Sequence, residues 1–193
     1  MKREPKLRSF DFDADRFKEL IVYITERCRD DPSFGAVKLN KILYYSDFDA
    51  YRLLGQPISG ATYRRLSEGP APKELLPARE ELITQGRIAL KEKSYFNRVQ
   101  KRLSLTSGEA SNPEMFSPDE RNVIDEVIRF FWGKSAREVS DYSYREPGWL
   151  AAGEREQIPY ETAWMSPEPI DQETEEHALG IAKEYLAKRQ ERQ

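Results

Sequence analysis

Cysteine and histidine are almost absent from this chain of 193 residues. The one cysteine, Cys28, has no partner for an internal disulfide, and a single cysteine also excludes a zinc site built on cysteines. Its place on the apolar side of the expected first helix indicates a buried core thiol. The one histidine, His177, lies in an acidic stretch of an expected surface helix, where we interpret it as a solvated residue.

Long apolar runs are also missing. No segment approaches the roughly 18 apolar residues that a membrane-spanning helix needs. Residues 1–15 lack the apolar centre of a secretory signal. We therefore expect a cytoplasmic protein that has no membrane partner.

The common catalytic motifs are absent as well. The chain has no Gly-x-Ser-x-Gly elbow, no P-loop and no His-Glu-x-x-His motif. A metal site would need carboxylates alone, and the run Glu173, Glu175 and Glu176 is typical of a solvated helix face. Asp47 and Glu68 are the acid/base pair that we considered, although the sequence does not fix their separation. We expect no enzyme, no catalytic residue, no metal and no cofactor.

The charges that are present are divided unevenly along the chain. Residues 1–105 contain 21 Lys and Arg against 15 Asp and Glu, a net of +6, and residues 106–193 contain 10 against 19, a net of −9. Such a division predicts one basic and one acidic face, unless the charges simply follow exposed surfaces.

The length and the hydrophobic spacing predict a single α+β domain that is dominated by helices and has a small antiparallel sheet of about three strands, including a hairpin. Capping boxes at Ser117 with Glu120 and at Ser135 with Glu138 mark two helix starts. We expect helices near residues 13–29, 37–54, 73–85, 118–132, 136–144 and 171–190, and strands near 58–66, 87–93 and 99–106. The expected divisions are a mobile arm (1–10), the domain (11–150) and a C-terminal extension (151–193) that ends in an acidic amphipathic helix packed on the same domain.

Two connecting segments complete this outline. Residues 68–72 predict a rigid Gly-Pro corner. Residues 147–169 predict an irregular segment, in which Trp149, Tyr160 and Trp164 anchor the chain to the core.

The expected helix over residues 37–54 carries a polar and aromatic pattern that core packing does not require. One strip of it contains Asn40, Tyr44, Asp47 and Tyr51. The neighbouring apolar stripe contains Leu39, Ile42, Leu43, Ala50, Leu53 and Leu54. The face left for water is centred on Lys38, Lys41, Tyr45, Asp49 and Arg52. We therefore expect Asn40 and Asp47 at the edge of a buried groove with polar partners, and we predict Lys41 or Arg64 as the partner of Asp47.

The stretch from Val37 to Pro72 resembles the signature of the SocA-like, or Panacea, antitoxin domain of bacteria and their phages. The resemblance is to a Lys-Leu-x-Lys helix that ends in Tyr-x-x-Asp and is followed by a Gly-Tyr strand and a Gly-Pro corner. The matching residues are Lys38, Leu39, Asn40, Lys41, Tyr44, Asp47, Gly60, Tyr63, Gly69 and Pro70.

A second stretch resembles the same family downstream. Residues 116–131 are similar to its Ser-x-x-Glu helix, and residues 135–149 are similar to its Ser-Ala-x-x-Leu-Ser…His…Trp segment, which ends here at Trp149. Val139 stands for the Leu of that segment, and Tyr144 stands where the His is common. A chemical role of that His would therefore be missing from this chain.

The resemblance implies a non-enzymatic antitoxin that binds a separate toxin, usually encoded by a neighbouring gene, and neutralises it by direct contact. The motif residues are then the scaffold, and partner specificity is expected from variable surfaces. The basic hairpin and the acidic last helix are the two surfaces that we predict for this role. An orphan phage or prophage accessory protein without a toxin fits the same residues.

A basic stretch supports a different reading, a DNA-binding transcriptional regulator. Its candidate phosphate contacts are Arg64, Arg65, Lys91, Lys93, Arg98, Lys101 and Arg102, interleaved with Tyr63, Tyr95 and Phe96. A hairpin of this composition is suited to touch phosphates, and equally suited to protect a sheet edge by its charges.

Overall fold

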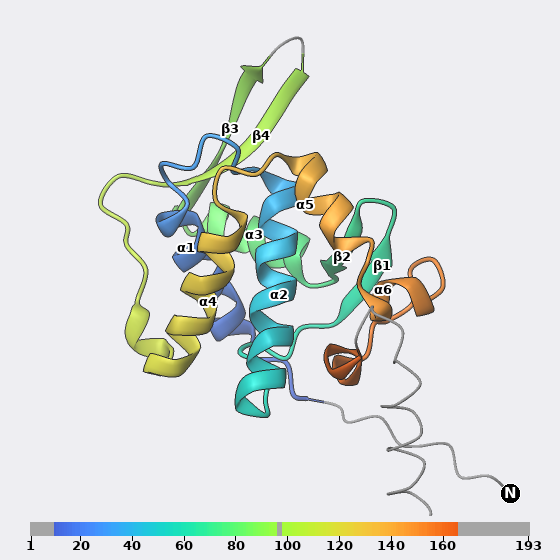
Figure 1. Cartoon of the computed structure of the whole chain (residues 1–193). Coiled ribbons are helices and arrows are strands. Elements are labelled where there is room, and N and C mark those ends of the chain that lie inside the picture. Colours follow the sequence, from blue (N-terminus) through green and yellow to red (C-terminus); the bar gives the residue numbers. More distant parts are fainter. Residues whose placement is uncertain (1–9, 96–97, 166–193) are drawn as a thin grey trace, which may run out of the picture.

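A computed structural model describes residues 10–95 and 98–165 (Figure 1). Helix α1 (Ala14–Arg27) begins after Asp13, whose carboxylate accepts hydrogen bonds from the backbone amides of Asp15 and Arg16. This N-cap satisfies two amides at the helix start. The predicted arm at the N-terminus and the predicted last helix, with His177, lie outside the described residues except for Phe10.

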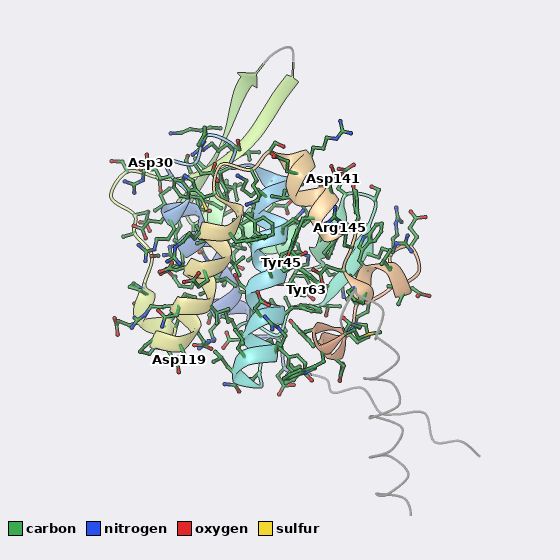
Figure 2. All side chains as sticks on the ribbon, in the orientation of Figure 1. Asp30, Tyr45, Tyr63, Asp119, Asp141 and Arg145 are labelled. Carbon is green, nitrogen blue, oxygen red and sulfur yellow. The ribbon has the colours of Figure 1, made fainter. Side chains whose placement is uncertain are left out.

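Helix α2 (Ala36–Leu54) occupies the centre of the molecule (Figure 1). It ends at Gly55, where φ is +84°, the left-handed conformation that glycine adopts most easily after a helix. Helices α1, α4 (Pro118–Phe131) and α5 (Ala136–Ser143) all contact it. The core is therefore arranged around α2, and Figure 2 shows Tyr45 and Tyr63 near this helix in the middle of the molecule.

The strands form two separate antiparallel ribbons. Strands β1 (Tyr63–Leu66) and β2 (Gly69–Pro72) pair from Tyr63 with Pro72 to Leu66 with Gly69. Strands β3 (Ile88–Tyr95) and β4 (Arg98–Leu105) form the second ribbon, and α3 (Leu75–Thr84) lies between the two in sequence. The helix-dominated α+β class is confirmed, and the strands are divided between two ribbons.

The Gly-Pro corner that the sequence predicted is strand β2. Prolines are tolerated there because each strand of a two-stranded ribbon is an edge strand. The predicted strand at 58–66 is shorter at its start, since Gly60 turns the chain with φ of +68°. A side chain at Gly60 would lie 2.5 Å from the carbonyl oxygen of Asp11, so the backbones approach too closely for any other residue.

Both predicted capping boxes are present. The Ser117 hydroxyl accepts from the amide of Glu120 at the start of α4, and Ser135 and Glu138 repeat the arrangement at the start of α5. A short 3-10 helix, η1 (Pro113–Met115), precedes α4.

The segment predicted as irregular contains two further helical turns, α6 (Pro147–Ala151) and η2 (Tyr160–Trp164). Tyr160 is buried and Trp149 packs against the core, as predicted. Trp164 is 64% exposed and makes an edge contact with the core residue Tyr51, at 6.4 Å between ring centroids, so it anchors the chain less than predicted. No described helix is long and apolar enough to cross a membrane.

The water-facing side of α2 was predicted wrongly. Lys38, Lys41 and Tyr45 are buried, because the loop after α1, the β1–β2 turn and helices α4 and α5 cover this face. Leu53 and Leu54, which were assigned to the apolar stripe, are 60% and 38% exposed. They lie on the last turn of α2.

Candidate functional site

The carboxylate of Asp47 is fully buried and is held by neutral donors. It accepts hydrogen bonds from the amide of Ser59 (2.8 Å), the hydroxyl of Ser59 (2.5 Å) and the hydroxyl of Tyr63 (2.8 Å). The Tyr160 hydroxyl lies 3.5 Å away and bonds the carbonyl oxygen of Ala61 at 2.7 Å. Burial raises the pKa of Asp47, and the hydrogen bonds from Ser59 and Tyr63 oppose that shift.

The predicted partners of Asp47 are wrong. Asp47 forms no ion pair with Lys41, Arg64 or any other described residue. Lys41 precedes Asp47 by six positions, which places the two side chains on different sides of α2. The neutral donors instead fix the start of β1 against the middle of α2.

Lys41 points to the turn between β1 and β2. Its ammonium donates to the carbonyl oxygens of Glu68 (2.5 Å) and Pro70 (3.3 Å). Burial lowers the pKa of Lys41 from its ordinary 10.5 to about 8. Gly69 lies beside it with φ of +98°, and a side chain there would come within 2.3 Å of the Ser143 hydroxyl. Only glycine fits this position.

The second family stretch reaches the same turn. The Ser140 hydroxyl donates to the carbonyl oxygen of Glu68 (3.2 Å), the Tyr144 hydroxyl to that of Ser67 (3.0 Å), and the Trp149 indole to that of Leu66 (3.1 Å). Together with Lys41, these side chains form the hairpin clamp, a name we use for Lys41, Ser140, Tyr144 and Trp149. The two sequence stretches therefore meet around one set of backbone carbonyls.

Tyr144 occupies the position where histidine is common in the family that the sequence resembles. Its ring packs against Trp149 at 4.9 Å between centroids, and its hydroxyl donates to the turn. The guanidinium of Arg65 lies 4.4 Å from the Trp149 ring centroid and donates to the carbonyl oxygen of Ala152 at 2.7 Å. At this position, an aromatic ring with a hydrogen-bond donor serves a packing role.

The remaining motif residues are also internal. Lys38 and Asp31 form an ion pair at 2.7 Å in which both side chains are buried, and Leu39 belongs to the core. Tyr44 is buried and packs against Tyr63 and Phe48. These contacts give the motif a scaffolding role.

Asn40 differs from the expectation of a satisfied polar group. Its side-chain oxygen is buried and has no hydrogen-bond partner among residues 10–95 and 98–165. We find no structural reason for this orphaned atom.

The pair considered for acid/base chemistry does not share a cavity. Asp47 is buried, whereas the side chain of Glu68 is exposed at the β1–β2 turn. Within the described part of the chain, no group of three or more His, Cys, Asp or Glu residues is placed to hold a metal ion.

The hairpin of β3 and β4 projects beyond the helices (Figure 1). Lys91 is exposed on it. Arg102, which pairs with Lys91 across the ribbon, instead donates to the carbonyl oxygens of Cys28 (3.2 Å), Arg29 and Asp31 (3.0 Å) after the end of α1. The structure describes only the backbone, within β3 and β4, of Lys93, Arg98 and Lys101. Arg64 is half-buried and forms a backbone bridge with Gln157.

A groove between α2, α4 and α5 was not anticipated from the sequence. It encloses about 630 Å³. Its walls include Tyr45, Asp49, Arg52, Leu53, Asn122, Glu126, Phe130, Phe131, Tyr142, Glu146 and Met165. Phe130 and Tyr142, which are 45% and 41% exposed, lie beside the apolar faces of their helices. Large aromatic residues next to a helical apolar stripe are the feature of the sequence that indicates such a surface.

The sequence of this chain matches a known protein family. The sequence model of the family described as "Antitoxin SocA-like, Panacea domain" matches residues 39–150, more than half of the chain. The match runs from α2 to α6 and includes Asp47 and all four residues of the hairpin clamp. A search of curated proteins gave no match. The resemblance inferred from the sequence is confirmed.

Proposed function

We propose that this chain, which belongs to the SocA-like, Panacea antitoxin family, neutralises a separate toxin protein by direct contact. Family membership supports an antitoxin-type role and suggests a non-catalytic one. The finer proposal is that inhibition results from a stable complex with a toxin encoded by a neighbouring gene.

The observation that carries the proposal is the internal use of the motif residues. The polar side-chain atoms form hydrogen bonds within the protein itself, as seen for Asp47, Lys41 and Trp149. Such residues preserve a fold and leave partner choice to other surfaces. A fold that fixes its framework in this way is suited to present an exposed surface to a protein partner.

The described surface offers a place for such a partner. The groove between α2, α4 and α5 combines exposed aromatic rings with carboxylates at its edge. Exposed apolar patches bordered by polar residues are typical of protein interaction sites. The other surface predicted for this role, the acidic last helix, lies outside the described residues.

Co-expression with the two neighbouring genes tests the proposal. Each product is expressed alone and together with the full 193-residue chain, and growth is followed. We expect one product to arrest growth alone and not when this chain is present. If neither product arrests growth, or if arrest continues in the presence of this chain, the proposed function is wrong and the orphan accessory reading replaces it.

A second candidate function is DNA binding by the hairpin. The projection of β3 and β4 beyond the helices, with Lys91 exposed, favours it. A phosphate-binding hairpin gives an affinity that falls steeply with salt. Titration of operator DNA from the chain's own promoter tests this, with Lys91→Ala as the variant. Affinity that is absent, or unchanged by salt and by the variant, would contradict it.

A further inference from the structure

The groove between α2, α4 and α5 contains a continuous aromatic wall. Tyr45 lies 5.2 Å from Phe131 and 5.5 Å from Tyr142, measured between ring centroids. Phe130 lies 4.9 Å from Tyr142. Helices α2, α4 and α5 thus each contribute a ring, and Phe130 and Tyr142 keep almost half of their surface open to a partner.

A carboxylate, that of Glu146, lies against this wall. Glu146 is half-buried and accepts a hydrogen bond from the Tyr45 hydroxyl at 2.8 Å. It makes no ion pair within the part of the chain that the structure describes. Burial raises the pKa of Glu146 and the negative charge of Asp49 adds to that shift, whereas the hydrogen bond from Tyr45 and the positive charge of Arg52 oppose it. A positive charge placed here would therefore be favoured by both carboxylates.

The other charges of the groove are already paired. Asp49 accepts from Arg52 at 3.1 Å, and Glu126 pairs with Arg129. Lys134 lies 4.5 Å from the ring centroid of Phe130, so one ring of the groove wall already holds a cation. Within residues 10–95 and 98–165, Glu146 is the charged group of the groove that forms no ion pair, and the charge of Arg52 acts on it only from a longer distance.

We infer that this groove binds a lysine or arginine side chain of the toxin. The toxin residues on either side of it are apolar, and their side chains cover Phe130 and Tyr142. The inference rests on the proposed function for the identity of the partner. The cation would pair with Glu146 and lie against the exposed face of Tyr142, which combines a charge-assisted hydrogen bond with a cation–π contact. The apolar neighbours would cover surface that water now contacts.

The chemistry of the groove is testable without the toxin. The full chain is titrated with acetyl-Leu-Arg-Leu-amide and with acetyl-Leu-Glu-Leu-amide, and backbone amide resonances are followed by NMR. We expect the arginine peptide to shift the resonances of Tyr142 and Glu146, and the glutamate peptide to leave them in place. Equal responses to the two peptides, or no response to either, would overturn the inference.

Two variants sharpen this test. Glu146→Gln keeps an acceptor for Tyr45 and removes the charge, so we expect about tenfold weaker binding of the arginine peptide. Glu80→Gln removes a carboxylate from the exposed face of α3, outside the groove, and should bind like the wild type. Equal affinity of Glu146→Gln and the wild type would contradict a role of Glu146.

The same variants connect the groove to the toxin. In the co-expression assay, we expect Glu146→Gln and Tyr142→Ala to lose rescue at expression levels where Glu80→Gln retains it. Rescue that is equal in all variants would exclude the groove as the toxin interface and leave the antitoxin function intact. If no neighbouring product is a toxin, the proposed function fails, and the peptide titration still decides whether the groove binds a cation.

Discussion

The hydroxyl of Tyr63 lies 2.8 Å from the carboxylate of Asp47, although the two residues are 16 positions apart in the chain. The same hydroxyl is 2.8 Å from the carbonyl oxygen of Leu43. One tyrosine thus joins the first residue of β1 to two positions of the central helix. Because all of these atoms are buried, the contact determines where the ribbon sits on α2.

Removal of the Asp47 carboxylate should destabilise the protein strongly. Asp47→Ala leaves the buried donors of Ser59 and Tyr63 without their acceptor, and we expect a loss of about 3 kcal/mol in the free energy of unfolding. The melting temperature should fall by several degrees. Tyr63→Phe removes a single donor and should cost about 1 kcal/mol. Urea denaturation measures both, and an unchanged stability of Asp47→Ala would refute the structural role.

The buried ammonium of Lys41 should make stability depend on pH in the alkaline range. Its pKa is about 8 in the folded protein and 10.5 ordinarily, so the folded state binds fewer protons between these values. The free energy of unfolding should therefore rise with pH in this window, by about 1 kcal/mol from pH 7 to pH 9.

The comparison with Lys41→Met isolates this contribution. Other groups also affect stability in this range, among them Cys28, whose pKa burial raises from 9.0 to about 12, so that its thiol ionises here only in the unfolded chain. Both proteins contain Cys28, so the difference between their pH profiles reports Lys41 alone. Parallel profiles between pH 7 and pH 9 would show that Lys41 keeps an ordinary pKa.

Gly69 should tolerate no side chain. We expect Gly69→Ala to destabilise the protein through its positive φ and through the clash with Ser143 and Lys41. Gly86→Ala is the matched control, since Gly86 has φ of +73° and open space around it. It should lose about 1 kcal/mol, and Gly69→Ala about 1–3 kcal/mol more. Equal losses in chemical denaturation would argue against close packing at the turn.

The Tyr144 hydroxyl should contribute modestly to the hairpin clamp. Tyr144→Phe removes its hydrogen bond to Ser67 and keeps the ring on Trp149, so we expect a loss of about 0.5–1 kcal/mol. Tyr142→Phe is the control, because no hydrogen bond of the Tyr142 hydroxyl is seen among the described residues. Thermal melts of both variants decide this, and a larger loss in Tyr142→Phe would contradict it.

The sequence predicted the local features of the fold well. Capping boxes at Ser117 and Ser135, and the glycine at the end of α2, depend on residues within one helical turn. The helix-dominated α+β class follows from such features, because each helix carries its own apolar periodicity.

The errors arose where distant segments meet. Lys38 and Lys41 fall on the polar side of α2 by sequence, and both are buried because Asp31 and the β1–β2 turn provide acceptors for their charges. Likewise, the donors around Asp47 come from Ser59 and Tyr63, which periodicity within a helix cannot connect to it. The groove joins rings from three helices, so only the packing of α4 and α5 on α2 reveals it.

Direct binding between the purified chain and the growth-arresting product of a neighbouring gene is the most decisive measurement. In isothermal titration calorimetry, the account predicts a complex of fixed stoichiometry that persists at moderate salt, and a much weaker one with Glu146→Gln. The absence of any complex with a product whose toxicity this chain nonetheless suppresses would contradict neutralisation by direct contact.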